Sequence, residues 1–248
     1  MTSPPRLGGR SPGEAGRAGR LETARLYVVT PDLPPDRVVD IATAAARGGA
    51  DVIQLRHKTL PRGELLTLAR RLRELFPPLG EGPGVRGPRG VEDSVGLKAG
   101  GWGRPLVIVN DHVDIAVLSG ADGVHLGPDD LSPRAARRIG GDRLLIGASA
   151  STVDAARSAV AEGADYIGCG AAFATPIKGE KTVIGPQGVA RVARALAPVP
   201  VFAIGGIDES NVKQLTALGV RRACVIRAVA DSPDPEQAVR RLRAMLTA

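Results

Sequence analysis

The stretch PLVIVNDHVDIAVLSGADGVHLGPDDLS, residues 105–132, holds two apolar runs separated by one short helix-like segment. Short runs rich in Val, Ile and Leu, here 105–110 and 123–127, are typical of strands that are buried on both faces of a parallel sheet. The segment between them ends at Gly120, and glycine commonly terminates helices. The stretch therefore predicts a strand, a helix and a second strand parallel to the first.

The same alternation of strand and helix extends through most of the chain. Helical patterns such as 36–50 and 152–164 separate the apolar runs, which lie at 25–30, 51–56, 105–110, 123–127, 144–149, 165–170, 200–205 and 222–227. Eight such units in one domain predict an α/β fold, a single (β/α)8 TIM barrel. A doubly wound open sheet is the alternative, but YVVTPDLPP after the first strand lacks the glycine-rich turn that binds dinucleotides.

Two segments have compositions that are typical of disorder. Residues 1–24 contain five Gly and three Pro, and residues 77–103 contain nine Gly and four Pro. Such segments bury too little apolar surface to offset the entropy of an ordered chain. We therefore expect a disordered tail at 1–24 and a catalytic barrel at 25–248. The barrel would carry a disordered insert at 77–103, before the third strand and on the face opposite the chemistry.

Composition and charge narrow the classes of partner. The chain carries a net charge of +7, but the basic residues are scattered and only six residues are aromatic, which argues against nucleic-acid binding. Cys169 and Cys224 lie inside apolar runs without disulfide or metal spacing, so we expect buried, reduced thiols. No run is long enough to span a membrane and no signal peptide is recognisable, which predicts a cytoplasmic protein.

Two carboxylates at strand ends indicate a metal site. Asn110 and Asp111 end the third strand, and Asp130 follows the fourth. Functional residues of parallel α/β folds gather at the carboxyl ends of the strands, where two carboxylates can share Mg²⁺ with phosphate oxygens. Each Asp could instead cap the next helix, although Ser132 before Pro133 is the better cap for its helix.

Further polar groups at the same end suit anionic ligands. Gln54, Arg56 and Lys58 alternate onto one side of the second strand, whereas His57 faces away and receives no role. Ser149 ends the fifth strand, and its hydroxyl is free for a ligand if Ser151 or Thr152 caps the helix that follows. His125, in mid-strand, is more simply a buried histidine with its hydrogen bonds satisfied.

The later loops supply a second anionic subsite. Thr175 and Lys178 lie on a long loop after the sixth strand, and long loops in compact barrels are often functional. The loops after strands seven and eight commonly bind phosphate in barrels, and here they hold Gly206, Ile226 and Arg227. Two phosphorylated small molecules at one barrel mouth indicate group transfer in which diphosphate leaves.

These residues resemble those of the thiamine-phosphate synthase family, whose members join the pyrimidine and thiazole halves of thiamine. The resemblance covers roughly residues 25–246, interrupted by the insert. Its motifs are QLRHK (54–58), VNDHVDIAVLSGADGVHLGPDDL (109–131), IGASAST (146–152), ADYIGCGAAFATPIK (164–178), VFAIGGI (201–207) and VIRAV (225–229). The block at 109–131 is the most specific of them.

The resemblance implies a transferase. It would condense 4-amino-2-methyl-5-(diphosphooxymethyl)pyrimidine with 4-methyl-5-(2-phosphoethyl)thiazole, in a dissociative reaction that depends on Mg²⁺. It implies that Asp111 and Asp130 bind the metal and that Lys58, Lys178 and Ser149 act in catalysis. The pyrimidine diphosphate would contact Gln54, Arg56, Lys58, Asn110, Ser149 and Lys178, and the thiazole phosphate would contact Thr175, Gly206, Ile226 and Arg227.

The chain departs from the family pattern at Ile177, Arg227, Ser151 and the pair Gly170-Ala171. Two alternatives remain open at the level of sequence. One is a related thiazole tautomerase on the same barrel, which lacks the paired aspartates and uses a histidine where this chain has Ser151. The other is a catalytically silent regulator that binds thiamine phosphates. A homo-oligomer is compatible with either function.

Overall fold

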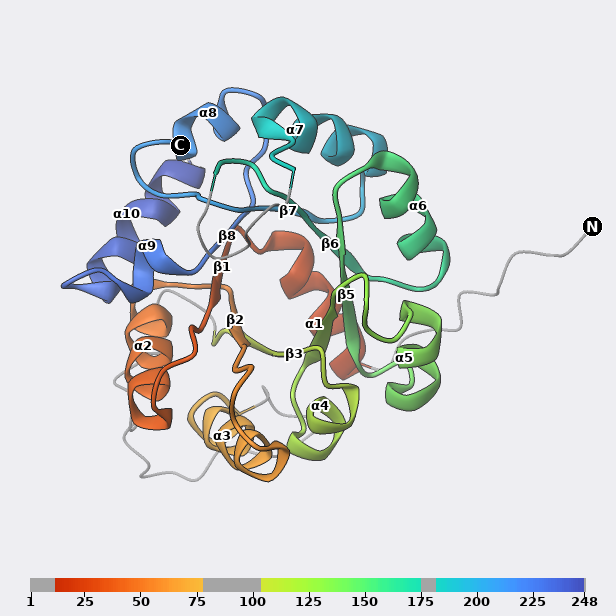
Figure 1. The fold of residues 1–248 in the computed structure, drawn as a ribbon, viewed down its shortest axis with the longest axis vertical. Coiled ribbons are helices and arrows are strands. Elements are labelled where there is room, and N and C mark those ends of the chain that lie inside the picture. The colour runs from red at the N-terminus through yellow and green to blue at the C-terminus, as the bar shows by residue number, and fades with distance from the viewer. Residues whose placement is uncertain (1–11, 78–103, 175–181, 248) are drawn as a thin grey trace, which may run out of the picture.

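The computed structural model describes residues 12–77, 104–174 and 182–247, and its strands form a closed barrel in chain order (Figure 1). All pairs of neighbouring strands are parallel, including β1 with β8, which closes the barrel. The predicted TIM barrel is therefore confirmed. Its strands are β1 (Leu26–Val29), β2 (Val52–Leu55), β3 (Leu106–Asn110), β4 (Gly123–Leu126), β5 (Leu145–Ala150), β6 (Tyr166–Gly170), β7 (Val201–Ile204) and β8 (Ala223–Val225).

Helices surround the strands as an outer ring (Figure 1). The ring consists of α2 (Pro35–Gly48), α3 (Arg62–Leu75), α4 (Val113–Ser119), α5 (Pro133–Gly140), α6 (Val153–Ala161), α7 (Gly185–Leu196), α8 (Val212–Thr216), α9 (Arg227–Ala230) and α10 (Pro235–Thr247). Ser132 and Thr152 accept backbone hydrogen bonds as the N-caps of α5 and α6, so the predicted cap at Ser132 is confirmed. No helix in the described residues is long and apolar enough to cross a bilayer.

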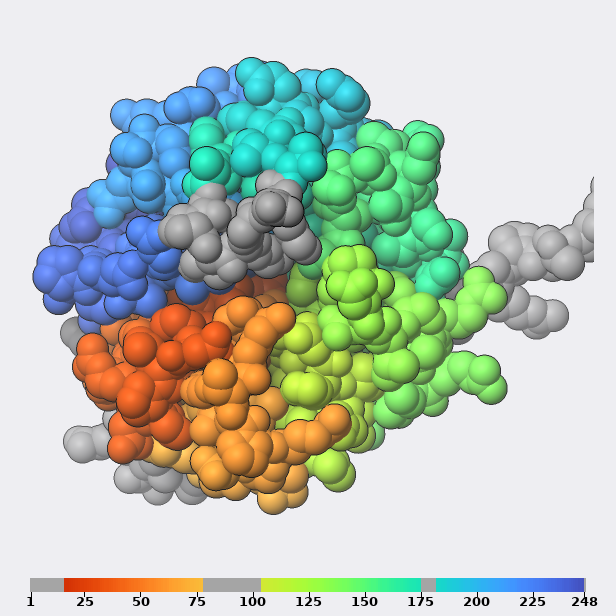
Figure 2. All heavy atoms as spheres, in the orientation of Figure 1, coloured from red at the N-terminus to blue at the C-terminus, as the bar shows by residue number. Residues whose placement is uncertain are grey.

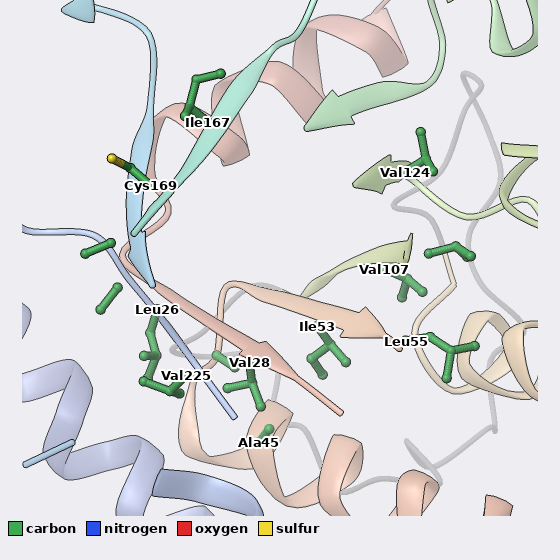
Figure 3. Close-up of a cluster of buried hydrophobic side chains, with 14 of the residues drawn as sticks. Leu26, Val28, Ala45, Ile53, Leu55, Val107, Val124, Ile167, Cys169 and Val225 are labelled. Carbon is green, nitrogen blue, oxygen red and sulfur yellow. The ribbon is translucent and has the colours of Figure 1, made fainter. Parts of the chain in front are cut away.

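Alternate residues of each strand pack into two separate apolar clusters. Outward-facing residues such as Val28, Ile53 and Val225 pack toward Ala45 and the helices (Figure 3). Inward-facing residues, among them Tyr27 and Tyr166, fill the barrel interior. Strands that bury both faces need apolar residues at nearly every position, which explains the unbroken runs in the sequence. Cys169 and Cys224 are buried and form no disulfide, as predicted.

The prediction that residues 1–24 are disordered is wrong for their second half. Residues 12–23 form a helix, α1 (Pro12–Thr23), which precedes β1. Ala18, Leu21 and Ala24, at a spacing of three, are buried, and Leu21 and Ala24 belong to the cluster inside the barrel. Three glycines weaken the intrinsic helix propensity, so tertiary burial rather than local preference holds α1 in place.

The tripeptide Gly-Ala-Asp precedes three of the eight strands. Its aspartate connects neighbouring elements at the amino end of the barrel. Asp51, Asp122 and Asp165 each accept a backbone N–H of the preceding odd-numbered strand. Each also receives an arginine from a surrounding helix, as Arg73 of α3 donates to Asp122 at 3.0 Å. The aspartate therefore links two adjacent strands to one helix, leaving the opposite end of the barrel free for function.

Three earlier predictions fall outside the described residues. These are most of the insert at 77–103 with its Trp102, the first part of the tail, and the loop residues Thr175 and Lys178. Their interpretation from the sequence stays a prediction.

Candidate active site

A cavity of about 410 Å³ opens at the carboxyl end of the barrel. Figure 2 shows this face, where segments from β2 and α3 (orange) to α9 (blue) surround the barrel centre. Eight of the predicted site residues line the cavity, which brings together side chains from five strands and their loops. They are Gln54, Arg56, Lys58, Asn110, Asp111, Asp130, Ser149 and Ile226.

The two aspartates line the same cavity and interact electrostatically. Asp111 has a φ of 63°, a left-handed conformation that aspartate tolerates better than most residues, and its N–H donates to the His125 carbonyl. Burial raises the pKa of Asp111, and contact with Asp130 raises it further, while Lys58 opposes the shift. His112, not Asp111, is the N-cap residue of α4. The alternative that Asp111 serves as a helix cap is therefore wrong.

The basic residues of the cavity are held by a carboxylate that the sequence reasoning missed. Asp32, in the loop after β1, accepts the backbone N–H of Lys58 at 2.6 Å and Nη1 of Arg56 at 3.0 Å. Partial burial alone would raise the pKa of Asp32, but these two donors outweigh it and lower the pKa. His57 is not among the lining residues, and its Nε2 lies 2.9 Å from the Leu33 carbonyl oxygen, as expected for a residue without a role.

The floor of the cavity is a row of hydrogen-bonded side chains. Gln54 Nε2 donates to Tyr27 Oη at 2.7 Å, and the two tyrosine hydroxyls lie 3.0 Å apart. Tyr166 Oη lies 3.3 Å from Nδ1 of His125, whose Nε2 lies 3.0 Å from Oγ of Ser149. The prediction that His125 is hydrogen-bonded is confirmed, but the residue also lines the cavity. Neither tyrosine stands out in the sequence, because each lies in an apolar run typical of ordinary strand core.

A second cavity of about 400 Å³ adjoins the first and is lined by the loops after β7 and β8. Gly206 and Arg227 line it, and Ile226 lines both cavities, as do Ile204 and Cys224. Gly206 has a φ of 61°, and a Cβ there would lie 2.4 Å from a backbone oxygen. Arg227 begins α9 and pairs with Asp231 at 3.0 Å. The structure thus divides the predicted residues between two adjoining cavities.

Comparison with known proteins identifies the family. The family model described as thiamine monophosphate synthase matches residues 103–229. A thiamine-phosphate synthase from Anaeromyxobacter dehalogenans is 41% identical over 94% of this chain and 92% of its own length. The chain belongs to the thiamine monophosphate synthase family. Another family member, the thiamine-phosphate synthase from Thermobifida fusca, is 40% identical over 92% of this chain and 95% of its own length.

Two further comparisons bear on length and on fold. The chain spans 57% of the thiamine-phosphate synthase from Thermosynechococcus vestitus, to which it is 39% identical. A solved thiamine phosphate pyrophosphorylase from Pyrococcus furiosus superposes with a TM-score of 0.73 at 32% identity, covering 92% of this chain and 97% of that one. The sequence relatives and the solved structure therefore support the same family, and the solved structure supports the barrel fold.

Proposed function

We propose that this chain joins 4-amino-2-methyl-5-(diphosphooxymethyl)pyrimidine to 4-methyl-5-(2-phosphoethyl)thiazole, giving thiamine phosphate and diphosphate. The observation that carries the proposal is the pair of adjoining cavities in a member of this family. One cavity holds carboxylates and basic groups, the other holds a glycine turn and Arg227, and the two share Ile204, Cys224 and Ile226. Two substrates bound in these cavities would meet at those three residues.

The basic residues would bind the diphosphate of the pyrimidine substrate. Arg56 and Lys58 line the same cavity as Asn110, and a fixed guanidinium suits phosphate oxygens. As the bond from the ring methylene to diphosphate oxygen breaks, its electron pair leaves with the diphosphate. Positive groups already placed there stabilise this growing negative charge without reorganisation. Lys178, outside the described residues, would add to them.

The paired aspartates fit Mg²⁺. Oxygen donors are the ligands that this ion prefers, and a divalent cation would offset both the burial and the nearby Asp130 that together raise the pKa of Asp111. No cluster of three or more His, Cys, Asp or Glu that could hold a metal occurs in the described residues, so substrate oxygens and water would complete the shell. The bound ion would supply Lewis-acid stabilisation of the leaving diphosphate.

The cavity floor would hold the pyrimidine ring while the amino group of the ring stabilises the cation left on the methylene. Phe202 lines the cavity beside the two tyrosines and offers an apolar surface to the ring. The thiazole nitrogen then donates its lone pair to the methylene and forms the new C–N bond. No proton is transferred in either step, so the site needs no strong general base.

The second cavity would hold the thiazole phosphate. Backbone N–H groups at Gly205 and Gly206 and the guanidinium of Arg227 are among the donors that the lining residues offer. Thr175 is expected to contribute from the adjacent loop.

The test mixes the full chain with both substrates and Mg²⁺ and measures thiamine phosphate and diphosphate by chromatography. Stoichiometric release of both products supports the proposal. Binding of both substrates by titration calorimetry without any product would instead indicate a silent binding protein. A chain that isomerises a thiazole carboxylate alone would be the tautomerase.

A further inference from the structure

The row of polar side chains beneath the cavity begins at a hydrogen bond whose donor is assigned, that from Gln54 to Tyr27. Gln54, Tyr27 and Tyr166 are each less than 5% exposed, so their polar atoms must find partners inside the protein. The Gln54 amide presents its NH₂ group, a donor only, to Tyr27 Oη. The single phenol proton of Tyr27 is then available to Tyr166 Oη, 3.0 Å away.

The same counting continues to the end of the row. If Tyr166 accepts the proton of Tyr27, its own proton is directed to Nδ1 of His125, 3.3 Å away. A neutral imidazole that accepts at Nδ1 carries its proton on Nε2. Nε2 therefore donates to Oγ of Ser149 at 3.0 Å. The Ser149 side chain has no other hydrogen bond to a described residue, so its proton points toward a ligand.

Local packing keeps these groups in line. β4, β5 and β6 place His125, Gly147 and Tyr166 at paired positions. A Cβ at Gly147 would lie 2.2 Å from Cζ of Tyr166 and 2.5 Å from Nδ1 of His125, so the glycine provides the space in which the two rings meet. Phe202 packs edge-on against both tyrosines, with ring centroids 5.4 Å and 5.8 Å away. Cys224 lies beside the phenols, and a thiol that donates to them would leave the direction unchanged.

We propose that the row Gln54–Tyr27–Tyr166–His125–Ser149 is a directed hydrogen-bond chain that holds His125 in its Nε2–H tautomer and makes the Ser149 hydroxyl a donor to the substrate ring. Tyr27, Tyr166 and His125 are then positioning residues that act through Ser149. A ring with an acceptor nitrogen opposite Ser149 is favoured over one with a donor there. The ligand preference rests on the proposed function, since an aminopyrimidine has such nitrogens. The tautomer of His125 is independent of the proposed function.

The tautomer is tested without substrate. The chain has three histidines, so ¹⁵N-histidine labelling gives three imidazole pairs, and the pair lost in His125→Gln identifies residue 125. Its spectrum should show a protonated Nε2 and an unprotonated Nδ1 at neutral pH. In Tyr166→Phe, Nδ1 loses its donor and the tautomer should become mixed. A protonated Nδ1 in the wild-type protein, or an unchanged spectrum in Tyr166→Phe, overturns the proposal.

A double-mutant cycle tests the action through Ser149. Tyr166→Phe and Ser149→Ala should each lower kcat/KM for the pyrimidine diphosphate by about tenfold, and the double variant should lose little more. The KM for the thiazole phosphate should stay within about twofold. Phe202→Leu is the control, because it perturbs the same aromatic cluster without touching a hydrogen bond, and its effect should add to that of Ser149→Ala.

The outcomes separate the two proposals. Additive losses in the cycle overturn the positioning role even when the tautomer is as expected. If the wild-type protein makes no thiamine phosphate, the proposed function is wrong. The tautomer experiment still decides the direction of the hydrogen-bond chain. If Tyr166→Phe does not fold, Tyr27→Phe removes the preceding donor and should likewise give a mixture of tautomers. An unchanged His125 spectrum in Tyr27→Phe would then overturn the proposal.

Discussion

Replacing Asp32 by Asn should lower kcat/KM for the pyrimidine diphosphate, although Asp32 is not among the residues that line the cavity. The Asp32 carboxylate holds the Lys58 N–H and the Arg56 guanidinium, one on each oxygen. Asparagine keeps the shape of the side chain but loses the charge and one acceptor, so its NH₂ group must face one of the two donors. We expect Arg56 to be released from its fixed position.

The exposure of the Asp32 and Arg56 side chains sets the size of the stability loss in Asp32→Asn. Hydrogen bonds to charged groups contribute roughly 1.5–3 kcal/mol each. The Asp32 side chain is 36% exposed and that of Arg56 18%, so solvent screening reduces the loss to about 1 kcal/mol. A chain of this size should then unfold about 2–4 °C lower. The same loss at the site corresponds to about a fivefold lower kcat/KM for the pyrimidine diphosphate.

Asp36→Asn is the matched control. Asp36 pairs with Arg71 at 2.8 Å but is 86% exposed, so the same change of charge should leave activity unaltered. Steady-state kinetics with each substrate varied, together with thermal unfolding, measure both variants. An equal loss in Asp36→Asn, or an unchanged kcat/KM in Asp32→Asn, would refute the reasoning.

The pH dependence gives an independent check. Because the pKa of Asp32 is lowered in the folded chain, its stabilisation is present above the ordinary aspartate value of 3.8 and is lost as pH falls through the lower folded value. The difference in melting temperature between wild type and Asp32→Asn should therefore be constant from neutral pH to about pH 5 and shrink below pH 4. A difference that grows as the solution becomes acidic would show that another group is responsible.

Three further changes test the rest of the site and the barrel. Asp111→Asn, which suits the left-handed backbone, should raise the melting temperature in EDTA by removing repulsion, yet lower kcat by about 10²-fold or more; near-normal turnover at saturating Mg²⁺ would contradict this. Arg227→Ala should raise the KM for the thiazole phosphate by about tenfold and that for the pyrimidine diphosphate little, whereas Asp231→Ala, which frees the guanidinium, should not raise either KM. Asp122→Ala leaves Arg73, only 10% exposed, without its carboxylate and should cost about 3–5 kcal/mol in urea unfolding; a loss below about 1 kcal/mol would show that the pair is dispensable.

The eight strands and the polar residues at their carboxyl ends could be read from the sequence. Seven of the eight strands lie within their predicted runs and β5 extends one residue beyond its run, to Ala150, because burial on both faces leaves a continuous apolar signature. The site residues at the strand ends converge because parallel strands of a barrel all point their carboxyl ends toward one face. Topology alone brings Gln54 and Asp130 to the same cavity, although they are far apart in the chain.

What the sequence did not reveal depends on contacts between distant segments. Helix α1 has weak intrinsic propensity, and only the open amino end of the barrel gives Leu21 a place to pack. Asp32 reads as an ordinary turn residue until folding places it against Arg56. Tyr27 and Tyr166 are 139 positions apart, and no local pattern could show that their hydroxyls meet.

The sequence by itself therefore determined the order of the elements, the family and the residues at the strand ends, because all of these are expressed in local apolar runs and short motifs. Only the tertiary structure decided which of those residues share a cavity, which carboxylate holds the Arg56 guanidinium, and which hydroxyls and ring nitrogens meet beneath the cavity. These properties depend on the positions of donors and acceptors to within a few tenths of an ångström, and only closure of the barrel fixes those positions.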